Sequence, residues 1–224
     1  MDNVIISIKD LTKTYKLGHN IVQALSGASI DVQKGEFLAV VGPSGSGKST
    51  LLQLIAGLEK PSSGVVLIDG VNLKTLSDRK LSRFRGQTIG FIFQFFYLQP
   101  FLRLSRNIEV PGMFARLKRK ERQQRIQQLA EVVGLTDRLS HFPSELSGGQ
   151  IQRAAIIRAL INQPKILLAD EPTGNLDSIN SAAIIELFEQ IRRQFGTTII
   201  IATHDAAIAA RADRIIYIKD GAII

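Results

Sequence analysis

Several residue types that carry common chemistries are missing from the sequence. None of the 224 residues is cysteine, which excludes disulfides, a thiolate nucleophile and cysteine-ligated zinc, and agrees with a reducing compartment. No apolar run approaches the roughly 18–20 residues that a membrane-spanning helix needs. The first ten residues carry acids where a secretory signal begins with basic residues. These absences predict a cytoplasmic protein whose metal, if any, is held by oxygen or histidine.

The residues that are present predict a globular chain with an anionic partner. Hydrophobic residues make up 45% and charged residues 21%, as in ordinary folded proteins, and the length suits one large domain. The net charge is +8, and residues 116–125 hold six basic residues and one acid. For this basic segment a solvated helix face is the favoured interpretation, and contact with an anionic membrane surface is the alternative.

Apolar patterning predicts an alternation of strands and helices. Short β-rich segments bounded by turn residues dominate the first third, and helical periodicity follows. The predicted strands are residues 4–8, 28–32, 37–41, 65–68, 166–169 and 198–202, and the predicted helices are residues 49–58, 120–133, 150–162 and 179–195. In the last helix Ile179, Ala183, Leu187, Ile191 and Phe195 recur every fourth residue, and we expect them to form a core face.

Three of the predicted strands end in residues that can carry chemistry. Residues 37–41 lead into a glycine-rich loop, 166–169 into Asp170-Glu171, and 198–202 into Thr203-His204-Asp205. Ligands of α/β proteins bind at the carboxyl ends of parallel strands, so we expect these motifs to meet in one crevice. The alternation is interrupted by a helical insertion, which we predict at about residues 95–160 within a single domain of residues 1–224.

The glycine-rich loop matches the phosphate-loop pattern, Gly-x-x-x-x-Gly-Lys-Ser. Glycines let backbone N–H groups surround phosphate oxygens, and the positive end of the next helix points at the same anion. We expect Lys48 to neutralise the β- and γ-phosphates and Ser49 to ligate Mg²⁺. The predicted nucleotide-contacting residues are Gly42, Pro43, Ser44, Gly45, Ser46, Gly47, Lys48, Ser49 and Thr50. A glycine turn with a chance Lys-Ser is the alternative, and the flanking strand and helix argue against it.

Two further motifs gain meaning from the phosphate loop. Asp170 lies at a strand tip, where it is expected to reach Mg²⁺, and Glu171 just beyond is expected to act as general base on a water in line with the γ-phosphate. Alone, such an acid pair is more often a helix cap or a solvated turn. Ser147 can cap a helix whose first residues, Gly148 and Gly149, expose N–H groups to an anion. Alone, this second segment is a weak signal, because chain reversal uses the same residues.

In this order, and over almost the whole chain, the phosphate loop, Leu146-Ser147-Gly148-Gly149-Gln150, Asp170-Glu171 and a late histidine resemble the nucleotide-binding subunit of an ATP-binding cassette (ABC) transporter. The resemblance implies an α/β phosphate-loop ATPase fold with an N-terminal antiparallel β part. It also implies ATP and Mg²⁺ as ligands and a head-to-tail homodimer in which residues 147–150 close over the partner's ATP. A transmembrane permease on a separate chain is the implied further partner, with no nucleic acid, and the location is peripheral at the inner face of the cell membrane.

The resemblance also assigns roles to single residues. It implies that Tyr15 stacks on adenine, that Gln94 links Mg²⁺ and the attacking water to the membrane subunit, and that His204 holds the γ-phosphate. Ser147 and Gly149 would touch the partner's γ-phosphate, with Gly148 and Gln150 in the same segment. Asp177 would bridge the dimer. Without the family pattern, Tyr15 reads as an ordinary strand aromatic and Gln94 as an ordinary loop residue.

Within the family, residues 22–24 with Gly35-Glu36-Phe37, and residues 169–177, look most like the subgroup that powers lipoprotein release, macrolide or peptide efflux and related envelope machines. The cell-division ATPase shares residues 174–177, so that type and an importer stay open. Ile151 and the aromatic run 95–101 depart from the common pattern. A soluble nucleic-acid or repair ATPase is disfavoured, because no coiled-coil insertion, zinc module or second cassette is present. A phosphate-loop kinase would leave residues 146–150 without a role.

Overall fold

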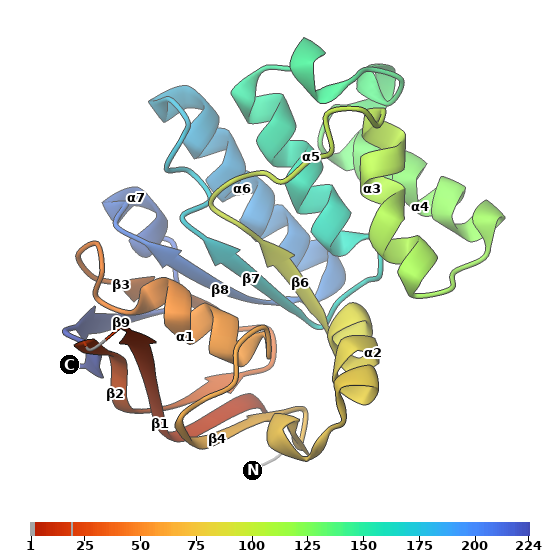
Figure 1. Ribbon diagram of the computed structural model, residues 1–224. Coiled ribbons are helices and arrows are strands. Elements are labelled where there is room, and N and C mark those ends of the chain that lie inside the picture. The colour runs from red at the N-terminus through yellow and green to blue at the C-terminus, as the bar shows by residue number, and fades with distance from the viewer. Residues whose placement is uncertain (1–2, 19) are drawn as a thin grey trace.

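The computed structural model describes residues 3–18 and 20–224 and contains two β-sheets with helix α1 between them (Figure 1). The smaller sheet has the order β2-β1-β4-β5, and the pairs are antiparallel. The larger has the order β10-β9-β3-β8-β7-β6, and all of its pairs are parallel except β9 with β10. The predicted α/β fold with an N-terminal antiparallel part is confirmed.

The elements follow one another with short connections. The strands are β1 (Val4–Leu17), β2 (Asn20–Gln33), β3 (Phe37–Val41), β4 (Ser63–Ile68), β5 (Val71–Asn72), β6 (Ile89–Ile92), β7 (Ile166–Asp170), β8 (Thr198–Thr203), β9 (Arg214–Lys219) and β10 (Ala222–Ile223). The α-helices are α1 (Lys48–Ile55), α2 (Asp78–Thr88), α3 (Leu104–Phe114), α4 (Arg119–Val132), α5 (Gly148–Leu160), α6 (Ser178–Phe195) and α7 (Ala206–Ala209). Single 3₁₀ turns occur at Leu73–Thr75, Thr136–Arg138 and Pro143–Glu145.

The larger sheet separates two hydrophobic cores, and alternate residues of its central strands enter one core or the other. In β7, Leu167 and Ala169 pack with α3 to α6, whereas Ile166 and Leu168 pack with α1 and the smaller sheet. Successive strand residues point to opposite faces, so a strand covered on both sides is apolar throughout. Because α3, α4 and α5 share their core with α6 and the sheet, a separate helical subdomain at about residues 95–160 stays a prediction.

Two expectations about elements were wrong in part. The first hairpin is longer than predicted, because β1 and β2 have 14 residues each and the outer half of β2 is largely exposed. In α6 the every-fourth-residue stripe is not one core face, since Ile179 is 82% and Phe195 41% exposed while Leu187 and Ile191 are buried. At 3.6 residues per turn, each step of four residues rotates about 40° beyond a full turn, so five positions spread over about 160°.

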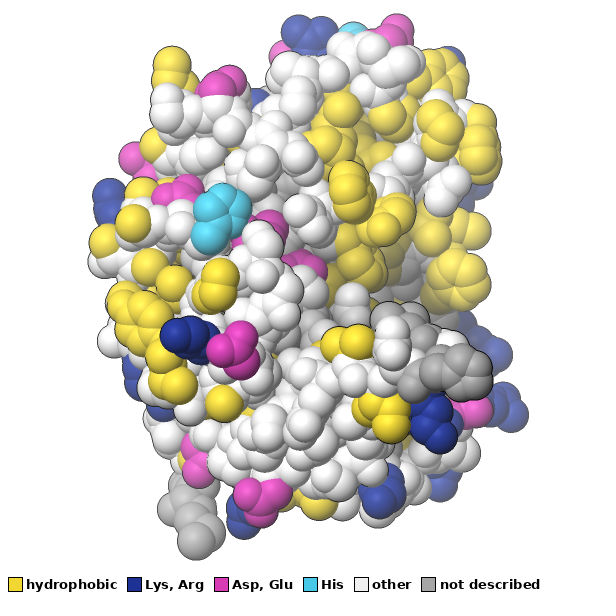
Figure 2. Space-filling model, turned by 60° about the vertical axis from the view of Figure 1, so that its left-hand side comes forward, with side chains coloured by type: hydrophobic (Ala, Val, Ile, Leu, Met, Phe, Trp, Pro, Cys, Tyr) yellow, Lys and Arg dark blue, Asp and Glu magenta, His cyan; other side chains and the backbone are white. Residues whose placement is uncertain are grey.

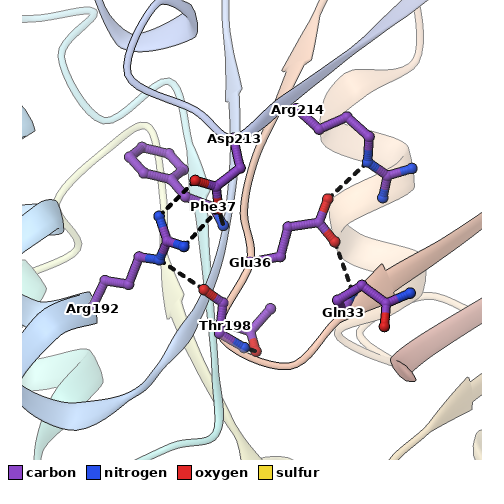
Figure 3. Close-up of polar contacts among 8 residues, drawn as sticks. Gln33, Glu36, Phe37, Arg192, Thr198, Asp213 and Arg214 are labelled. Atoms are coloured by element: carbon purple, nitrogen blue, oxygen red, sulfur yellow. Dashed lines mark hydrogen bonds and ion pairs between the residues drawn. The ribbon is translucent and has the colours of Figure 1, made fainter. Parts of the chain in front are cut away.

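Polar side chains fasten the end of the larger sheet that lies away from the glycine-rich loop (Figure 3). Asp213 accepts the backbone N–H of Phe37 at 2.9 Å and pairs with Arg192 at 2.7 Å. Glu36 accepts the N–H of Gln33 and the Nε of Arg214, each at 2.7 Å. These contacts tie the start of β3 to β9 and α6, and so set the direction in which β3 delivers the glycine-rich loop.

Over residues 3–18 and 20–224, no helix is both long and apolar enough to cross a membrane.

Candidate functional site

The glycine-rich loop joins β3 to α1 and has no room for side chains at two positions. A Cβ at Gly42 would lie 2.2 Å from the carbonyl oxygen of Ile218, and one at Gly47 would lie 2.4 Å from that of Ala24. Gly47 also has φ = 108°, a conformation that residues with a side chain rarely adopt. No acid lies in the first turn of α1, so its positive end keeps its full attraction for anions.

Side chains of the loop carry polar groups suited to a phosphate. Lys48 is buried, and its Nζ donates to the carbonyls of Gly42 at 2.8 Å and Pro43 at 3.1 Å, so the ammonium lies inside the loop. The Oγ of Ser46 is buried and lacks a hydrogen-bond partner among the described residues. Such a hydroxyl is unfavourable unless a ligand or water pairs with it. Pro43, Ser44 and Gly45 form the exposed rim.

Asp170 and Ser49 meet where the tip of β7 reaches the start of α1. The Ser49 hydroxyl donates to Asp170 Oδ1 at 2.9 Å. Burial raises the pKa of the Asp170 carboxyl above its ordinary value of 3.8, and the neighbouring Glu171 charge adds to this effect, whereas the Ser49 hydrogen bond and the Lys48 charge oppose it. A hydroxyl and a single carboxylate are few protein ligands for a metal, which fits Mg²⁺ held largely by phosphate and water.

Glu171 lies between the side chains of Lys48 and His204. Its Oε1 is 3.5 Å from Lys48 Nζ, and its Oε2 is 2.8 Å from His204 Nδ1. Its backbone has φ = 47°, and its N–H donates to the carbonyl of Ala202 in β8 at 2.8 Å. The side chain therefore turns from the strand tip toward the phosphate loop. The structure thus brings Lys48, Glu171 and His204 into contact, as the expected single crevice requires.

The segment after β8 is held by two residues to which we assigned no role. Asp205 caps α7 by accepting the N–H of Ala207 at 2.8 Å, and Thr173 Oγ1 donates to its other oxygen at 3.4 Å. These bonds connect the loop after Glu171 to the loop that carries His204, whose side chain is 70% exposed. The Asp205 cap is visible in the sequence as an acid before a short helix, whereas its contact with Thr173 depends on tertiary structure.

Gln94, Asn175 and Arg158 belong to a connected group beside the acid pair. Gln94 is exposed after β6, and its carbonyl accepts from Asn175 Nδ2 at 3.1 Å. Arg158 of α5 donates to the carbonyls of Phe96 at 2.8 Å and Tyr97 at 2.6 Å. Arg158 therefore fixes the aromatic segment after Gln94 to the helix that begins at Gly148. The sequence carries no signal for this contact, because it joins residues about 60 positions apart.

The segment 147–150 lies at the start of α5, where Gly149 packs against Asn180 of α6. Ser147 caps α5 as predicted, with Gln150 N donating to its Oγ at 3.4 Å and its own N–H donating to Gln150 Oε1 at 2.9 Å. A Cβ on Gly149 would lie 2.2 Å from Asn180 Oδ1.

Asp177 caps α6 beside this segment. Its carboxylate accepts the backbone N–H and the side-chain Nδ2 of Asn180, both at 2.8 Å. Hydrogen bonds from the Asn180 backbone and side chain lower the pKa of Asp177 below its ordinary value of 3.8. Among the described contacts, none joins Ser147, Gly149 or Asp177 to the phosphate loop of the same chain.

Tyr15 lies on β1, directly across from Val22 of β2, and is half-buried. Two residues further along β2, Ala24 meets the phosphate loop at Gly47. The predicted base-stacking residue is thus on a strand pair that contacts the predicted phosphate site.

Comparison with known proteins places these features in a family context. Residues 25–174 match the family model described as ABC transporter. The chain is 43% identical over 219 residues to the lipoprotein-releasing system ATP-binding protein LolD of Bacteroides fragilis, covering 98% of this chain and 100% of that one. It is 43% identical over 220 residues to the macrolide export ATP-binding/permease protein MacB of Shigella flexneri, covering 98% of this chain and 34% of that one. A dimeric post-hydrolysis structure of the cassette MJ0796 of Methanocaldococcus jannaschii, bound to ADP and Pi, superimposes with a TM-score of 0.91 at 41% identity, covering 98% and 96% of the two chains.

Proposed function

The chain belongs to the ABC transporter family of ATP-binding, ATP-hydrolysing cassettes, and on this premise we propose that two copies close around two Mg²⁺-ATP and drive a separate membrane protein. The observation that carries the proposal is the meeting of Lys48, Glu171 and His204 next to the Ser49–Asp170 hydrogen bond. It joins the positive charge, the base and the metal-ligating oxygens that phosphoryl transfer to water requires.

The proposed chemistry follows from what each side chain can do. Glu171 accepts a proton from the attacking water, a role typically worth about 10²–10⁴ in rate. Lys48 and His204, already in contact with Glu171, offer positive charge and hydrogen-bond donors to the γ-phosphate. Ser49, Asp170 and Gln94 are the proposed Mg²⁺ ligands, and Mg²⁺ when bound neutralises charge on the phosphate oxygens.

Head-to-tail pairing explains why one chain has two phosphate-binding helix starts. Ser147 bonds within its own helix and Gly149 lies against Asn180 of α6, and among the described contacts neither touches the phosphate loop of the same chain, which leaves the N-terminus of α5 available to a second molecule. The related cassette MJ0796 forms dimers in two solved structures. Asp177 lies beside this surface at the start of α6, which supports its proposed role in bridging the two chains.

Exposed aromatic side chains and a basic groove support docking of a membrane partner. Phe95, Tyr97, Phe101 and Phe114 are 61%, 61%, 73% and 86% exposed, and apolar side chains gather on the face drawn in Figure 2. A groove of about 630 Å³ between α2 and α3 has Phe91, Phe93 and Phe114 in its lining, together with Arg79, Arg83 and Arg116. We propose that a cytoplasmic segment of a permease occupies this surface, that the chain is peripheral at the inner face of the cell membrane, and that nucleic acid is not a partner.

The basic segment 116–125 contributes less free charge than its sequence implies. Arg122 pairs with Glu109 at 2.8 Å, and Arg125 pairs with Glu121 at 2.7 Å, with both arginine side chains less than a fifth exposed. Four basic residues of the segment remain exposed. These four and the arginines of α2 form the surface that we propose faces the membrane partner or its anionic lipids.

Dimer formation in the Glu171→Gln variant tests the proposed cycle. Removing the base should reduce ATPase activity by at least about 10²-fold while leaving ATP bound, so Mg²⁺-ATP should double the mass measured by light scattering. ADP should leave the variant monomeric, and Lys48→Ala in the same background should abolish the dimer. Near-normal turnover in Glu171→Gln, or a mass unaffected by ATP, would contradict the proposal.

The partner is tested by capturing tagged Glu171→Gln with Mg²⁺-ATP in solubilised membranes of the host. We expect a membrane protein with few spans, as in lipoprotein release or macrolide export, and the matched variant Phe114→Asp should lose it while still forming the ATP dimer. A many-span permease would indicate an importer, and a division-site membrane protein would indicate the cell-division type. Recovery of nucleic acid alone would exclude the transport role.

A further inference from the structure

The ammonium of Lys13 in β1 is buried among polar and aromatic partners, which an ordinary strand lysine does not need. Its side chain is only 11% exposed, although lysine is rarely buried without partners. Its Nζ donates to Glu59 Oε2 at 2.7 Å and to the carbonyl of Lys60 at 2.8 Å. The same Nζ lies 4.8 Å from the centre of the Tyr15 ring. Two acceptors and one aromatic face thus surround a charge that would be unfavourable in this place without them.

The two acceptors of Lys13 belong to the segment that leaves α1. Glu59 and Lys60 follow shortly after Ile55, the last residue of the phosphate-loop helix. Lys13 therefore connects β1 to the segment that follows the end of α1, the helix whose start carries the phosphate loop. These two acceptors fix the position of the Lys13 ammonium, which lies over one face of the Tyr15 ring.

The strand pair around Tyr15 is irregular where it passes the phosphate loop. Lys13 pairs with Leu25 and the next residue of β1 pairs with Gln23, so Ala24 is an extra residue in β2. Ala24 is the residue whose carbonyl lies against Gly47. A bulge of this kind redirects side chains, and bulges are frequent beside functional sites.

We propose that Lys13 is a positioning residue for the base of the bound nucleotide. Its ammonium attracts one face of the Tyr15 ring and holds the ring in place, so that the opposite face is presented to adenine. Because Lys13 is anchored next to α1, it also fixes the distance between the ring and the phosphate loop. This inference rests on the proposed role of Tyr15, and it assigns Lys13 no contact with the phosphates.

The test compares a nucleotide with a ligand that has no base. Calorimetric titration with Mg²⁺-ADP and with Mg²⁺-pyrophosphate avoids both hydrolysis and ATP-driven dimerisation. Lys13→Met keeps the aliphatic stem and removes the ammonium, and it should weaken ADP binding about three- to tenfold. Pyrophosphate binding should change less than about twofold. Lys16→Met, which removes an exposed lysine of the same strand, is the matched control for net charge and should leave both affinities unchanged.

Two further variants separate this inference from the function on which it rests. Tyr15→Ala should weaken ADP about tenfold or more and leave pyrophosphate unaffected, and Lys13→Arg, which keeps a cation over the ring, should recover most of the ADP affinity. If Tyr15→Ala binds ADP normally, both the stacking role and the inference are wrong. If only Tyr15→Ala is defective, the Lys13 inference alone is wrong.

A purely structural role, in which Lys13 only holds β1 against the segment after α1, predicts a different effect on the two affinities. A loosened phosphate loop would weaken pyrophosphate and ADP by the same factor in Lys13→Met, and that outcome would overturn the inference. If Lys13→Met does not fold, Lys13→Gln still donates to the Lys60 carbonyl and must show the selective loss of ADP affinity.

Discussion

Glu109 offers a sharp test of how the helices next to the sheet are held together. Its side chain is 5% exposed in α3, and its two oxygens accept from Arg122 Nε of α4 at 2.8 Å and from Arg106 at 2.5 Å. Arg122 is 15% exposed, and its only other acceptor within the described residues is the carbonyl of Leu117. Removing one partner of a buried ion pair costs about 3–5 kcal/mol, because the other charge is left in a poor environment.

We expect Glu109→Ala to lower the free energy of unfolding by about 3 kcal/mol, at the lower end of that range, since Arg122 keeps one carbonyl and some contact with water. For a chain of this size the corresponding fall in Tm is about 6–12 °C. Urea unfolding followed by circular dichroism measures the change. Arg106→Ala removes the partner that is 57% exposed and should cost at most about 1 kcal/mol.

An apolar replacement of the whole pair completes the argument. Glu109→Leu combined with Arg122→Leu removes both charges and should return most of the lost stability.

Burial works to raise the pKa of Glu109, but the hydrogen bonds from Arg122 and Arg106 outweigh it, so the pKa lies below its ordinary value of 4.5. The pair therefore stabilises the fold above that pH and loses its effect as the pH falls through the lower folded value. Equal losses in Glu109→Ala and Arg106→Ala would refute the reasoning.

Three other substitutions follow from close contacts and charges. Gly47→Ala places a Cβ 2.4 Å from a carbonyl of β2 at a positive φ, so ADP binding measured by calorimetry should be lost, and normal affinity would contradict the assigned loop geometry. Gly149→Ala meets Asn180 at 2.2 Å and should destabilise the fold by about 1–3 kcal/mol, whereas Gly148→Ala, with 3.6 Å to its nearest neighbour, should unfold close to wild type. Against the effect of burial, a backbone amide of β3 and an arginine of α6 lower the pKa of Asp213 below 3.8. The free energy of unfolding should therefore fall less between about pH 5 and 3 in Asp213→Asn than in the wild type, as measured by acid titration.

The buried strands and the motifs at their ends were predictable because both signals are local. Residues 37–41, 166–169 and 198–202 are apolar apart from Thr198, and they form three adjacent parallel strands whose tips carry the predicted side chains. The meeting of Lys48, Glu171 and His204 follows from that placement.

What escaped sequence reasoning depends on partners far along the chain. The outer half of the first hairpin has no regular alternation of apolar and polar residues, since Ile21 and Val22 are adjacent and both exposed, so its sequence does not mark it as strand. The helix α2 has few apolar residues to signal it: its only large ones are Leu81 and Phe84, which are partly buried against the second core. The positive φ of Glu171 and the contact of Arg158 with the aromatic segment arise only when separate segments pack together.

The two cores on either side of the larger sheet constrain how α1 and α5 can move relative to each other. Helix α1, which begins at the phosphate loop, packs in one core, and α5, which begins at the segment that we propose binds a second anion, packs in the other. Strand β7 is one of the central strands whose residues enter both cores, and every one of its residues is buried. A displacement of α5 relative to α1 must therefore move one packed helix layer across the central strands of the larger sheet. The strand that ends at the acid pair thus lies between the two helices that we propose bind phosphate.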